Sequence, residues 1–288
     1  MAIEIRPLEA SFGAQVLGLD PEAPLDEPTK AGLRTAFDEH GLLVFRDRVI
    51  PFAVQVELCE LLVHGDDRSL RVGGEAGPSD DYYVSNTKED GATPFGRLPF
   101  HLDGMWSTQP YLALSLCAME IEEPSVPTCY ASMARAWTTL PDDLRHRVEG
   151  LHARHALVVI PRGEHPEEVV VADFGLDFSQ TKPVAHHHPR TGRPLLYVSQ
   201  QMTTEIVDID PEASEALLGD LFDHLYQPAN LLEHTWRAGD LVIWDNVAVQ
   251  HSRPDVQADG PVRTLRKYGT PDIVMEAVPD VAYSRASD

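Results

Sequence analysis

The stretch Pro99-Phe100-His101-Leu102-Asp103-Gly104-Met105-Trp106 decides the fold, together with Ile243-Trp244-Asp245-Asn246-Val247-Ala248-Val249-Gln250-His251 much later in the chain. Alternate side chains of an extended backbone point to the same face, so His101 and Asp103 are expected to lie side by side. Two imidazoles and one carboxylate, with open positions opposite them, form the triad that holds non-haem iron(II). An H-x-D tripeptide alone is weak evidence, because it also occurs by chance at strand edges. The assignment therefore depends on the rest of the sequence.

The composition is that of a globular protein with an ample core: 288 residues, 43% hydrophobic and 24% charged. There is no internal repeat, low-complexity tract or linker that would divide it. We therefore expect a single domain over residues 1–288. The formal net charge of −23 repels phosphate backbones and anionic headgroups, which argues against nucleic acid and membrane surfaces as partners.

Three cysteines, Cys59, Cys117 and Cys129, lack a CxxC pairing and stand in apolar contexts. Buried, reduced thiols are the expected state, which is typical of a cytoplasmic protein. The N-terminal residues lack an apolar signal core, and no apolar run approaches the length of a membrane span. We expect a cytoplasmic protein.

Short strands alternate with a few helices along the chain. Helices are expected from Asp26 to Gly41, over residues 52–64, over parts of 132–151 and after Asp210, and strands at 42–45, 82–85, 111–119, 241–244 and 263–268. This pattern predicts a mainly β fold with inserted helices, in which the ends of distant strands meet at one mouth, as in a jelly roll.

Three segments have no regular pattern. Residues from about 66 to 100, interrupted by the strand at 82–85, are expected to form a long lid-like loop before the H-x-D stretch. Residues 162–188 are expected to be irregular, and the acidic tail, about 271–288, to be peripheral.

The proposed triad of His101, Asp103 and His251 would occupy three of about six positions on iron(II), and the remainder suit a bidentate 2-oxo acid and dioxygen. Arg263 is expected on the next strand after His251, where its guanidinium could form a paired contact with the far carboxylate of that acid. Thr128 could donate a hydroxyl hydrogen bond to the same carboxylate.

These residues carry a resemblance to a known family. The chain resembles the iron(II)/2-oxoglutarate-dependent dioxygenases of the taurine dioxygenase and chlorophenoxyacetate dioxygenase family, over nearly its whole length. The motifs that carry the resemblance are Phe12-Gly13-Ala14 to Gly18-Leu19, the H-x-D stretch, Thr128, Gly192-Arg193-Pro194-Leu195-Leu196-Tyr197-Val198, Gly239-Asp240 before Trp244-Asp245-Asn246, and His251 with Arg263.

The resemblance implies the rest of the assignment. The family fold is the double-stranded β-helix, or jelly roll, and homo-oligomers are frequent. By position, His101, Asp103 and His251 resemble the metal ligands, and Thr128 and Arg263 resemble the groups that hold 2-oxoglutarate. The implied reaction uses Fe(2+), 2-oxoglutarate and O2 to hydroxylate an unactivated C–H bond of a small molecule, releasing succinate and carbon dioxide. Because Asp103 is present, no ligand position is vacant for chloride, and halogenation is not expected.

The substrate pocket departs from the family pattern. Lys267 stands where the family often has a second arginine that reads an anionic substrate. Strand alternation places Lys267 on the face of Arg263 and Arg266 on the opposite face, so Lys267 is the expected pocket residue. Trp106, Asn86 and Arg97 are further candidates for substrate contact, and taurine itself is not expected. Ser125-Val126-Pro127 replaces the usual Gly-Gly-Asp before the threonine.

Two alternatives remain from the sequence. The same iron site could end in desaturation or another oxidative step of a secondary-metabolite pathway, since both begin with the same hydrogen abstraction. A metal-binding β-barrel without redox chemistry, either a hydrolase or a sensor, would have no use for Arg263 and Thr128. Asp245 and Asn246 are expected to serve turn chemistry or contacts behind the site rather than catalysis.

Overall fold

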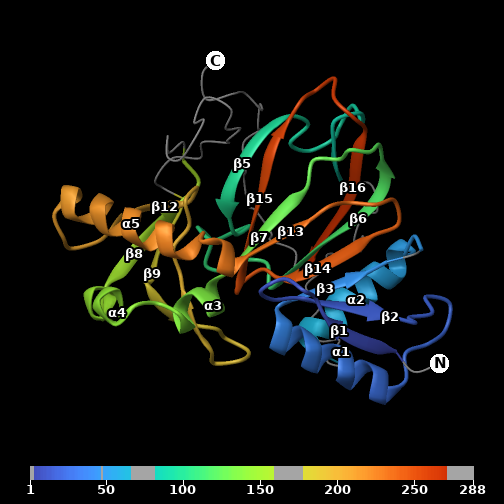
Figure 1. Ribbon diagram of the computed structural model, residues 1–288, viewed down its shortest axis with the longest axis horizontal. Helices are drawn as coiled ribbons and strands as arrows, with labels where there is room; N and C mark the ends of the chain where they lie inside the picture. The colour runs from blue at the N-terminus through green and yellow to red at the C-terminus, as the bar shows by residue number, and fades with distance from the viewer. Residues whose placement is uncertain (1–2, 47, 66–81, 159–177, 271–288) are drawn as a thin grey trace.

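Two facing β-sheets form the centre of the protein. The computed structural model describes residues 3–46, 48–65, 82–158 and 178–270. Within these ranges it is mainly β with few helices, as expected (Figure 1). The first sheet has seven strands in the order β1-β2-β3-β14-β6-β16-β4. Their bounds are Glu4–Pro7, Ala14–Leu17, Leu42–Phe45, Leu241–Asp245, Ala113–Ile121, Arg263–Thr270 and Tyr83–Ser85.

The second sheet has four strands in the order β13-β7-β15-β5, all antiparallel to their neighbours. Their bounds are Leu231–His234, Thr128–Ser132, Val249–Val256 and Gly96–His101. Apolar side chains from both sheets fill the space between them, with Trp244 of β14 and Tyr130 of β7 in contact at a ring distance of 5.3 Å. This shared core fixes how the two sheets face each other.

Two helices cover the outer face of the seven-stranded sheet. Helix α1, Glu27–His40, begins where Asp26 accepts a hydrogen bond from the Thr29 amide, and ends at Gly41 in the left-handed conformation, as predicted. Helix α2, Phe52–His64, matches the predicted range. Both pack on buried residues of β3, β6 and β14. The helical spacing of apolar residues therefore predicted both helices correctly.

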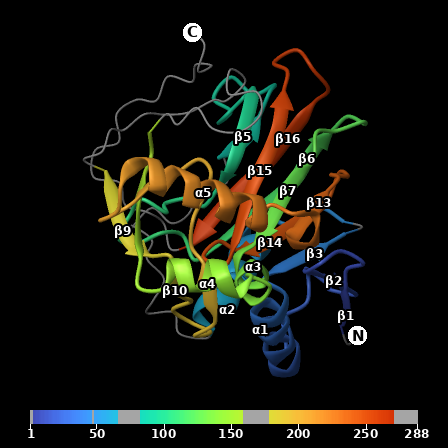
Figure 2. The same ribbon diagram turned by 60° about the vertical axis from the view of Figure 1, so that its left-hand side comes forward.

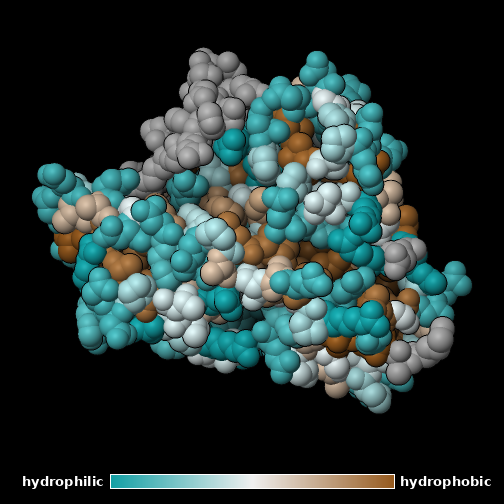
Figure 3. Space-filling view, viewed as in Figure 1, coloured by the Kyte–Doolittle hydropathy of each residue, from teal (hydrophilic) through white to brown (hydrophobic). Residues whose placement is uncertain are grey.

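A second group of elements packs beside the four-stranded sheet. It contains helices α3, α4 and α5 (Met133–Thr138, Asp142–Val148, Pro211–Leu225), the 3-10 helix η3 (Pro228–Asn230), a sheet of β12, β8 and β9 (Thr203–Ile206, His152–Ala156, Ser179–Pro183) and the pair β10 and β11 (Ala185–His187, Pro194–Leu196). The end of α5 lies against the four-stranded sheet, where Tyr226 stacks on Phe100 of β5 at 4.4 Å (Figure 2). Hydrophilic residues cover most of the face shown in Figure 3.

Several predictions need correction or lie outside the described residues. Residues 179–187 form the regular strands β9 and β10, so the irregular interpretation of this part is wrong. Strand β5 occupies the end of the predicted loop over 66–100, whose residues 66–81 lie outside the described ranges, as do 159–177 and the tail 271–288. Cys59 and Cys117 are buried free thiols, but Cys129 is only partly buried. No helix in the described ranges is long and apolar enough to cross a bilayer.

Candidate metal centre

The two histidines of the predicted triad are cross-strand neighbours. Strand β15 pairs with β5, and in this register His251 lies directly opposite His101. Their ring centroids are 4.1 Å apart. The indole of Trp244 packs behind His251 at 4.9 Å. Strand pairing therefore fixes the separation of the two imidazoles before any ion binds.

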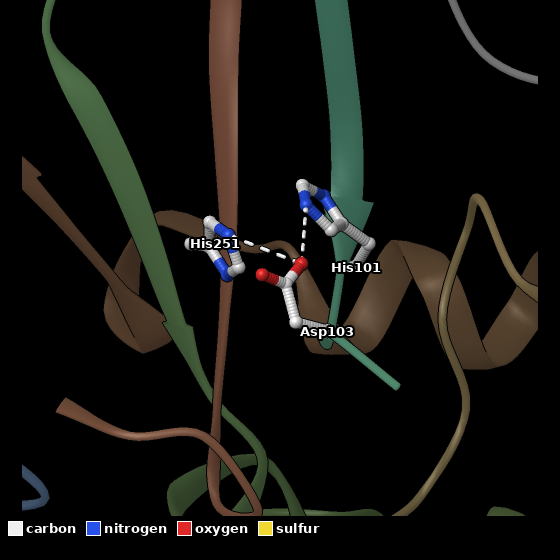
Figure 4. Close-up of side chains that lie close together, drawn as sticks. All are labelled: His101, Asp103 and His251. Carbon is white, nitrogen blue, oxygen red and sulfur yellow. Dashed lines mark ion pairs between the residues drawn. The ribbon is translucent and has the colours of Figure 1, made fainter. Parts of the chain in front are cut away.

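Asp103 reaches the two histidines from a turn. Strand β5 ends at His101, so the expectation of one continuous extended segment through Asp103 is wrong. The chain turns immediately after the strand, and Gly104 adopts a positive φ of 77°, which glycine tolerates at no steric cost. The carboxylate nevertheless reaches the histidines, because the turn directs it back toward the strand pair (Figure 4).

The three side chains point toward one another (Figure 4). Oδ1 of Asp103 lies 3.4 Å from Nε2 of His101 and 3.9 Å from Nε2 of His251. One donor atom from each residue lies within 4.8 Å of the others, and within the described residues this is the one such set of three or more histidine, cysteine or acidic side chains. Donors about 2 Å from a shared ion lie roughly 3 Å apart at right angles, so a small inward shift would complete a metal site.

The hydrogen bonds and charges suit a divalent cation. Nδ1 of His101 lies 2.7 Å from the Pro99 carbonyl, which can only accept a hydrogen bond, so Nδ1 is the donor there and Nε2 is the ring nitrogen that faces the site. Burial and the neighbouring His101 hold the pKa of His251 well below its usual value, against the opposing effect of Asp103, so its imidazole is neutral. Nδ1 of His251 is buried and forms no hydrogen bond within the described residues.

Asp103 is ionised because of Lys267. Burial would raise the pKa of the carboxyl, but the Lys267 ammonium, a hydrogen bond from His101 and the nearby His251 together hold it well below its usual range. The Lys267 ammonium contacts Oδ2, the other oxygen of the carboxylate. The site therefore offers two imidazoles and one carboxylate, the donor set expected for non-haem iron(II).

The predicted 2-oxoglutarate residues also meet. Arg263 at the start of β16 donates from a terminal nitrogen to the hydroxyl oxygen of Thr128 on β7, at 3.0 Å. Its Nε donates to the Val126 carbonyl at 3.0 Å. The Thr128 oxygen also accepts from the indole nitrogen of Trp236, at 3.0 Å. The hydroxyl oxygen thus accepts two hydrogen bonds, and its own hydrogen has no acceptor among the described residues.

Arg263 is a buried cation with no anionic partner in the part of the chain that the structure describes. It is 4% exposed, and no carboxylate in the described ranges forms an ion pair with it. Burial, assisted by the nearby Arg253, lowers the pKa of Arg263 to about 9, so it remains charged at neutral pH. A buried, charged guanidinium is costly unless it is paired, and three of its five N–H groups remain for a ligand. A carboxylate ligand would supply the missing partner.

The alternation predicted along the final strand is confirmed. Arg263 and Lys267 face the space between the sheets, where they contact Thr128 and Asp103. Arg266 faces the other side and donates to Gln55 of α2 at 2.9 Å. Lys267 therefore lies on the same face of β16 as Arg263, and its charge is balanced by Asp103.

The other three candidates occupy different surroundings. Both polar atoms of the Asn86 side chain bond to backbone, donating to the Pro261 carbonyl at 3.0 Å and accepting from the Arg263 amide at 2.9 Å. Asn86 thus holds the start of β16, which corrects its assignment to substrate contact. Arg97 lies on β5, but the pairing register of β5 with β15 shifts between Leu98 and His101, so strand alternation does not place Arg97 on the face of His101. Trp106 is partly buried and meets Phe178 edge-on at 6.2 Å.

Two residues that support the site were not found from the sequence. Trp236 orients Thr128, and nothing in the local pattern distinguishes it from a core tryptophan. Arg253 donates to the carbonyls of Thr93, Phe95 and Gly96 at 2.8 Å and so holds the beginning of β5. The sequence signal that could have identified Arg253 is its position two residues after the proposed metal ligand His251.

Comparison with known proteins agrees with this geometry. The profile of the family described as "Taurine catabolism dioxygenase TauD, TfdA family" matches residues 4–268. An (S)-phenoxypropionate/alpha-ketoglutarate-dioxygenase of Sphingobium herbicidovorans is 30% identical over 268 residues, covering 87% of this chain and 88% of that protein.

Solved structures give the same result. A taurine dioxygenase from Burkholderia xenovorans aligns with a TM-score of 0.73 at 25% identity, over 93% of this chain and 90% of its own. The structure of AAD-2 in complex with Mn(II) and N-oxalylglycine aligns with a TM-score of 0.70 at 25% identity, over 93% of this chain and 97% of its own.

Proposed function

The chain belongs to the taurine catabolism dioxygenase TauD, TfdA family, and from this premise we propose which of its residues serve an iron(II)- and 2-oxoglutarate-dependent dioxygenase. The enzyme is an oxidoreductase that uses Fe(2+), 2-oxoglutarate and O2 to hydroxylate a C–H bond of a small molecule. The observation that carries the assignment is the convergence of His101, Asp103 and His251 from β5, the turn after it and β15. These three residues would hold the metal.

The overall reaction converts R–H, O2 and 2-oxoglutarate into R–OH, succinate and carbon dioxide. One oxygen atom enters the new hydroxyl group and the other enters the succinate carboxylate. The bound iron supplies the activation of O2 that neither organic partner achieves alone. The protein keeps Asp103 ionised and the imidazole of His251 neutral, so these two donors are ready at neutral pH.

Arg263 and Thr128 would bind the distal carboxylate of 2-oxoglutarate. The support is the buried guanidinium, which has no counter-charge among the described residues, and the hydroxyl group 3.0 Å away, whose hydrogen has no acceptor among them. Binding there would leave the oxo-acid end directed at the metal ligands. Fixing the co-substrate at both ends orients it for the reaction and lowers the entropic cost of the productive arrangement.

For the substrate, we propose a small molecule that could be anionic. Trp106 would form an apolar wall, and Arg97 and Lys267 would provide positive charge. The name of the Sphingobium herbicidovorans relative includes phenoxypropionate, a small anion, and this supports a small anionic substrate.

The remaining proposals concern the fold, the domain extent, the location and the oligomeric state, and the observations support them less directly. We propose that the facing sheets, with their shared core, form a double-stranded β-helix, and that residues 1–288 act as one domain, which the profile match over 4–268 supports. Free cysteines support a cytoplasmic location. We also propose a homo-oligomer, because homo-oligomers are frequent in the family. The alternatives of desaturation and of a non-redox barrel are not favoured, because the family is one of dioxygenases.

The test has two stages. Anaerobic addition of Fe(II) and 2-oxoglutarate to the metal-free protein should produce a weak visible charge-transfer band. Admission of air in the presence of candidate substrates, beginning with aryloxy acids, should release succinate above the uncoupled background. The His101→Ala variant should show neither band nor succinate, while His152→Ala, on the exposed side of β8, should behave as the wild type. A wild-type protein without the band and without succinate would refute the assignment.

A further inference from the structure

The backbone of Asp103 lies just beyond the end of a strand. The ladder between β5 and β15 ends at the pair His101 and His251, so no neighbouring strand is available for the next residues. Buried peptide groups need hydrogen-bond partners, and an unpaired one costs free energy. The position of the carboxylate depends on whatever holds this peptide in place.

Asn246 provides both missing partners. Its carboxamide nitrogen donates to the Asp103 carbonyl at 2.9 Å, and its carboxamide oxygen accepts from the Asp103 amide at 3.3 Å. The same nitrogen also donates to the Tyr111 carbonyl at 2.9 Å. A primary amide presents the donor and acceptor of a peptide group, so the side chain takes the place of the next strand residue.

Asn246 is itself firmly placed. It is fully buried, and its backbone amide donates to the Leu112 carbonyl at 3.0 Å. The residue before it, Asp245, pairs with Ala113 at the end of β14. The turn that follows leads into β15 and to His251. One short segment therefore supplies the third proposed ligand and also holds the backbone of the second.

We propose that Asn246 is a positioning residue for the metal centre: it fixes the peptide of Asp103 so that Oδ1 faces both imidazoles. The inference rests on the proposed function, since it takes the triad as the metal site. Aspartate at position 246 would have the same shape but would place carboxylate oxygens against the carbonyls of Asp103 and Tyr111. Neither alanine nor aspartate could reproduce the paired contact.

The test measures metal affinity directly. Calorimetric titration of the metal-free protein with Mn(II) should give a dissociation constant about 10–100-fold higher for Asn246→Ala and Asn246→Asp than for the wild type. The matched control is Asn230→Ala, because Asn230 is also fully buried and its carboxamide donates to a backbone carbonyl, that of His224, at 2.9 Å. Both alanine variants should lose thermal stability, but only Asn246→Ala should lose metal affinity.

A double-mutant comparison separates positioning from general damage. In an Asp103→Ala background, adding Asn246→Ala should weaken Mn(II) binding no further, because the substitution acts through Asp103. The Co(II) ligand-field spectrum should change in Asn246→Ala and remain that of the wild type in Asn230→Ala. An Mn(II) dissociation constant of Asn246→Ala within about twofold of the wild-type value would overturn the proposal.

One measurement needs no variant. In the metal-free wild type the amide of Asp103 should be protected from hydrogen exchange by its bond to Asn246. Rapid exchange of this amide would overturn the proposal even if the position-246 variants fail to fold. If the wild type binds no Mn(II) at all, the failure belongs to the proposed metal site rather than to the role of Asn246.

Discussion

The Lys267 ammonium contacts Oδ2 of Asp103, while Oδ1 of the same carboxylate faces His101 and His251. The two oxygens of Asp103 therefore have separate partners. One oxygen is available to a metal ion, and the other is held by a side chain from the neighbouring sheet. With a metal ion bound, Asp103 would then offer Oδ1 as its donor, and the other positions would remain for the co-substrate and O2.

Replacing Lys267 should make the fold depend more on metal. In the metal-free protein, Lys267→Met leaves a buried carboxylate without its cation, and we expect a loss of about 3 kcal/mol and a Tm lower by roughly 6–10 °C. A bound metal ion would restore a positive partner, so Mn(II) should raise the Tm of Lys267→Met more than that of the wild type. Differential scanning calorimetry with and without Mn(II) measures both shifts.

The control for this experiment is Lys182→Met. Lys182 is also partly buried, but its ammonium donates to the carbonyls of Met105 and Ser107 and, among the described residues, to no carboxylate. Its replacement should not enlarge the shift produced by Mn(II). Equal Mn(II) shifts in the wild type and in Lys267→Met would show that the ion pair contributes nothing to the balance of charge at the site.

The same pair predicts a pH dependence. In the wild type the pKa of Asp103 is held well below its usual value by Lys267, despite burial, so its stabilising contribution is present above about pH 4 and lost only below it. In Lys267→Met, burial raises this pKa, and the destabilisation present at neutral pH disappears as the carboxyl is protonated. The difference in unfolding free energy should therefore be largest near about pH 7.5 and shrink toward about pH 5. Urea unfolding of both metal-free proteins across this range measures it, and a constant difference would contradict the prediction.

Arg263 and Arg266 provide a matched pair for testing the co-substrate site. Both are buried arginines of β16, on opposite faces of the strand. Arg263→Gln removes the charge beside Thr128 and should raise the KM for 2-oxoglutarate about 100-fold, the equivalent of roughly 3 kcal/mol. Arg266→Gln should lower thermal stability and leave this KM unchanged. Initial rates of succinate formation at varied 2-oxoglutarate give both values, and equal effects would remove the assignment of Arg263.

Trp236 should act on the co-substrate through Thr128. Trp236→Phe removes the indole donor at 3.0 Å, so the threonine hydroxyl loses one of its constraints. We expect the KM for 2-oxoglutarate to rise about fivefold, the equivalent of one neutral hydrogen bond of about 1 kcal/mol, with kcat little changed. Trp137→Phe, a similar change in α3, should leave this KM unaltered. A fall in kcat without a change in KM would contradict the role.

Local patterns in the sequence predicted much of this site. The two-residue period of a strand depends only on neighbouring backbone, and it correctly separated Arg263 and Lys267 from Arg266. Helix α1 was found from its capping residue and its terminal glycine, which are also local signals. The expected meeting of distant strand ends in a jelly roll joined His251 to the H-x-D stretch, and the resemblance to the family supported it. No short-range pattern contains this relationship.

The contacts between distant segments were beyond sequence reasoning. The turn after His101, rather than a continued strand, carries Asp103, because Asn246 from another segment replaces the missing strand partner. Asn86 resembled a pocket residue, but its amide is used by the backbone around Arg263. The contact of Lys267 with Asp103 likewise depends on how the two sheets meet. Contacts of this kind can be identified only when the partner strand is known.

The pairing of His101 with His251 has a practical meaning for protein engineering. A one-residue insertion in either β5 or β15 would turn one imidazole to the other side of its sheet, so libraries should keep both strands at fixed length. The connection between α4 and β8, which contributes no proposed ligand, can be varied in length and composition without shifting this register. Altered selectivity should therefore be sought by remodelling connections while the paired strands are left intact.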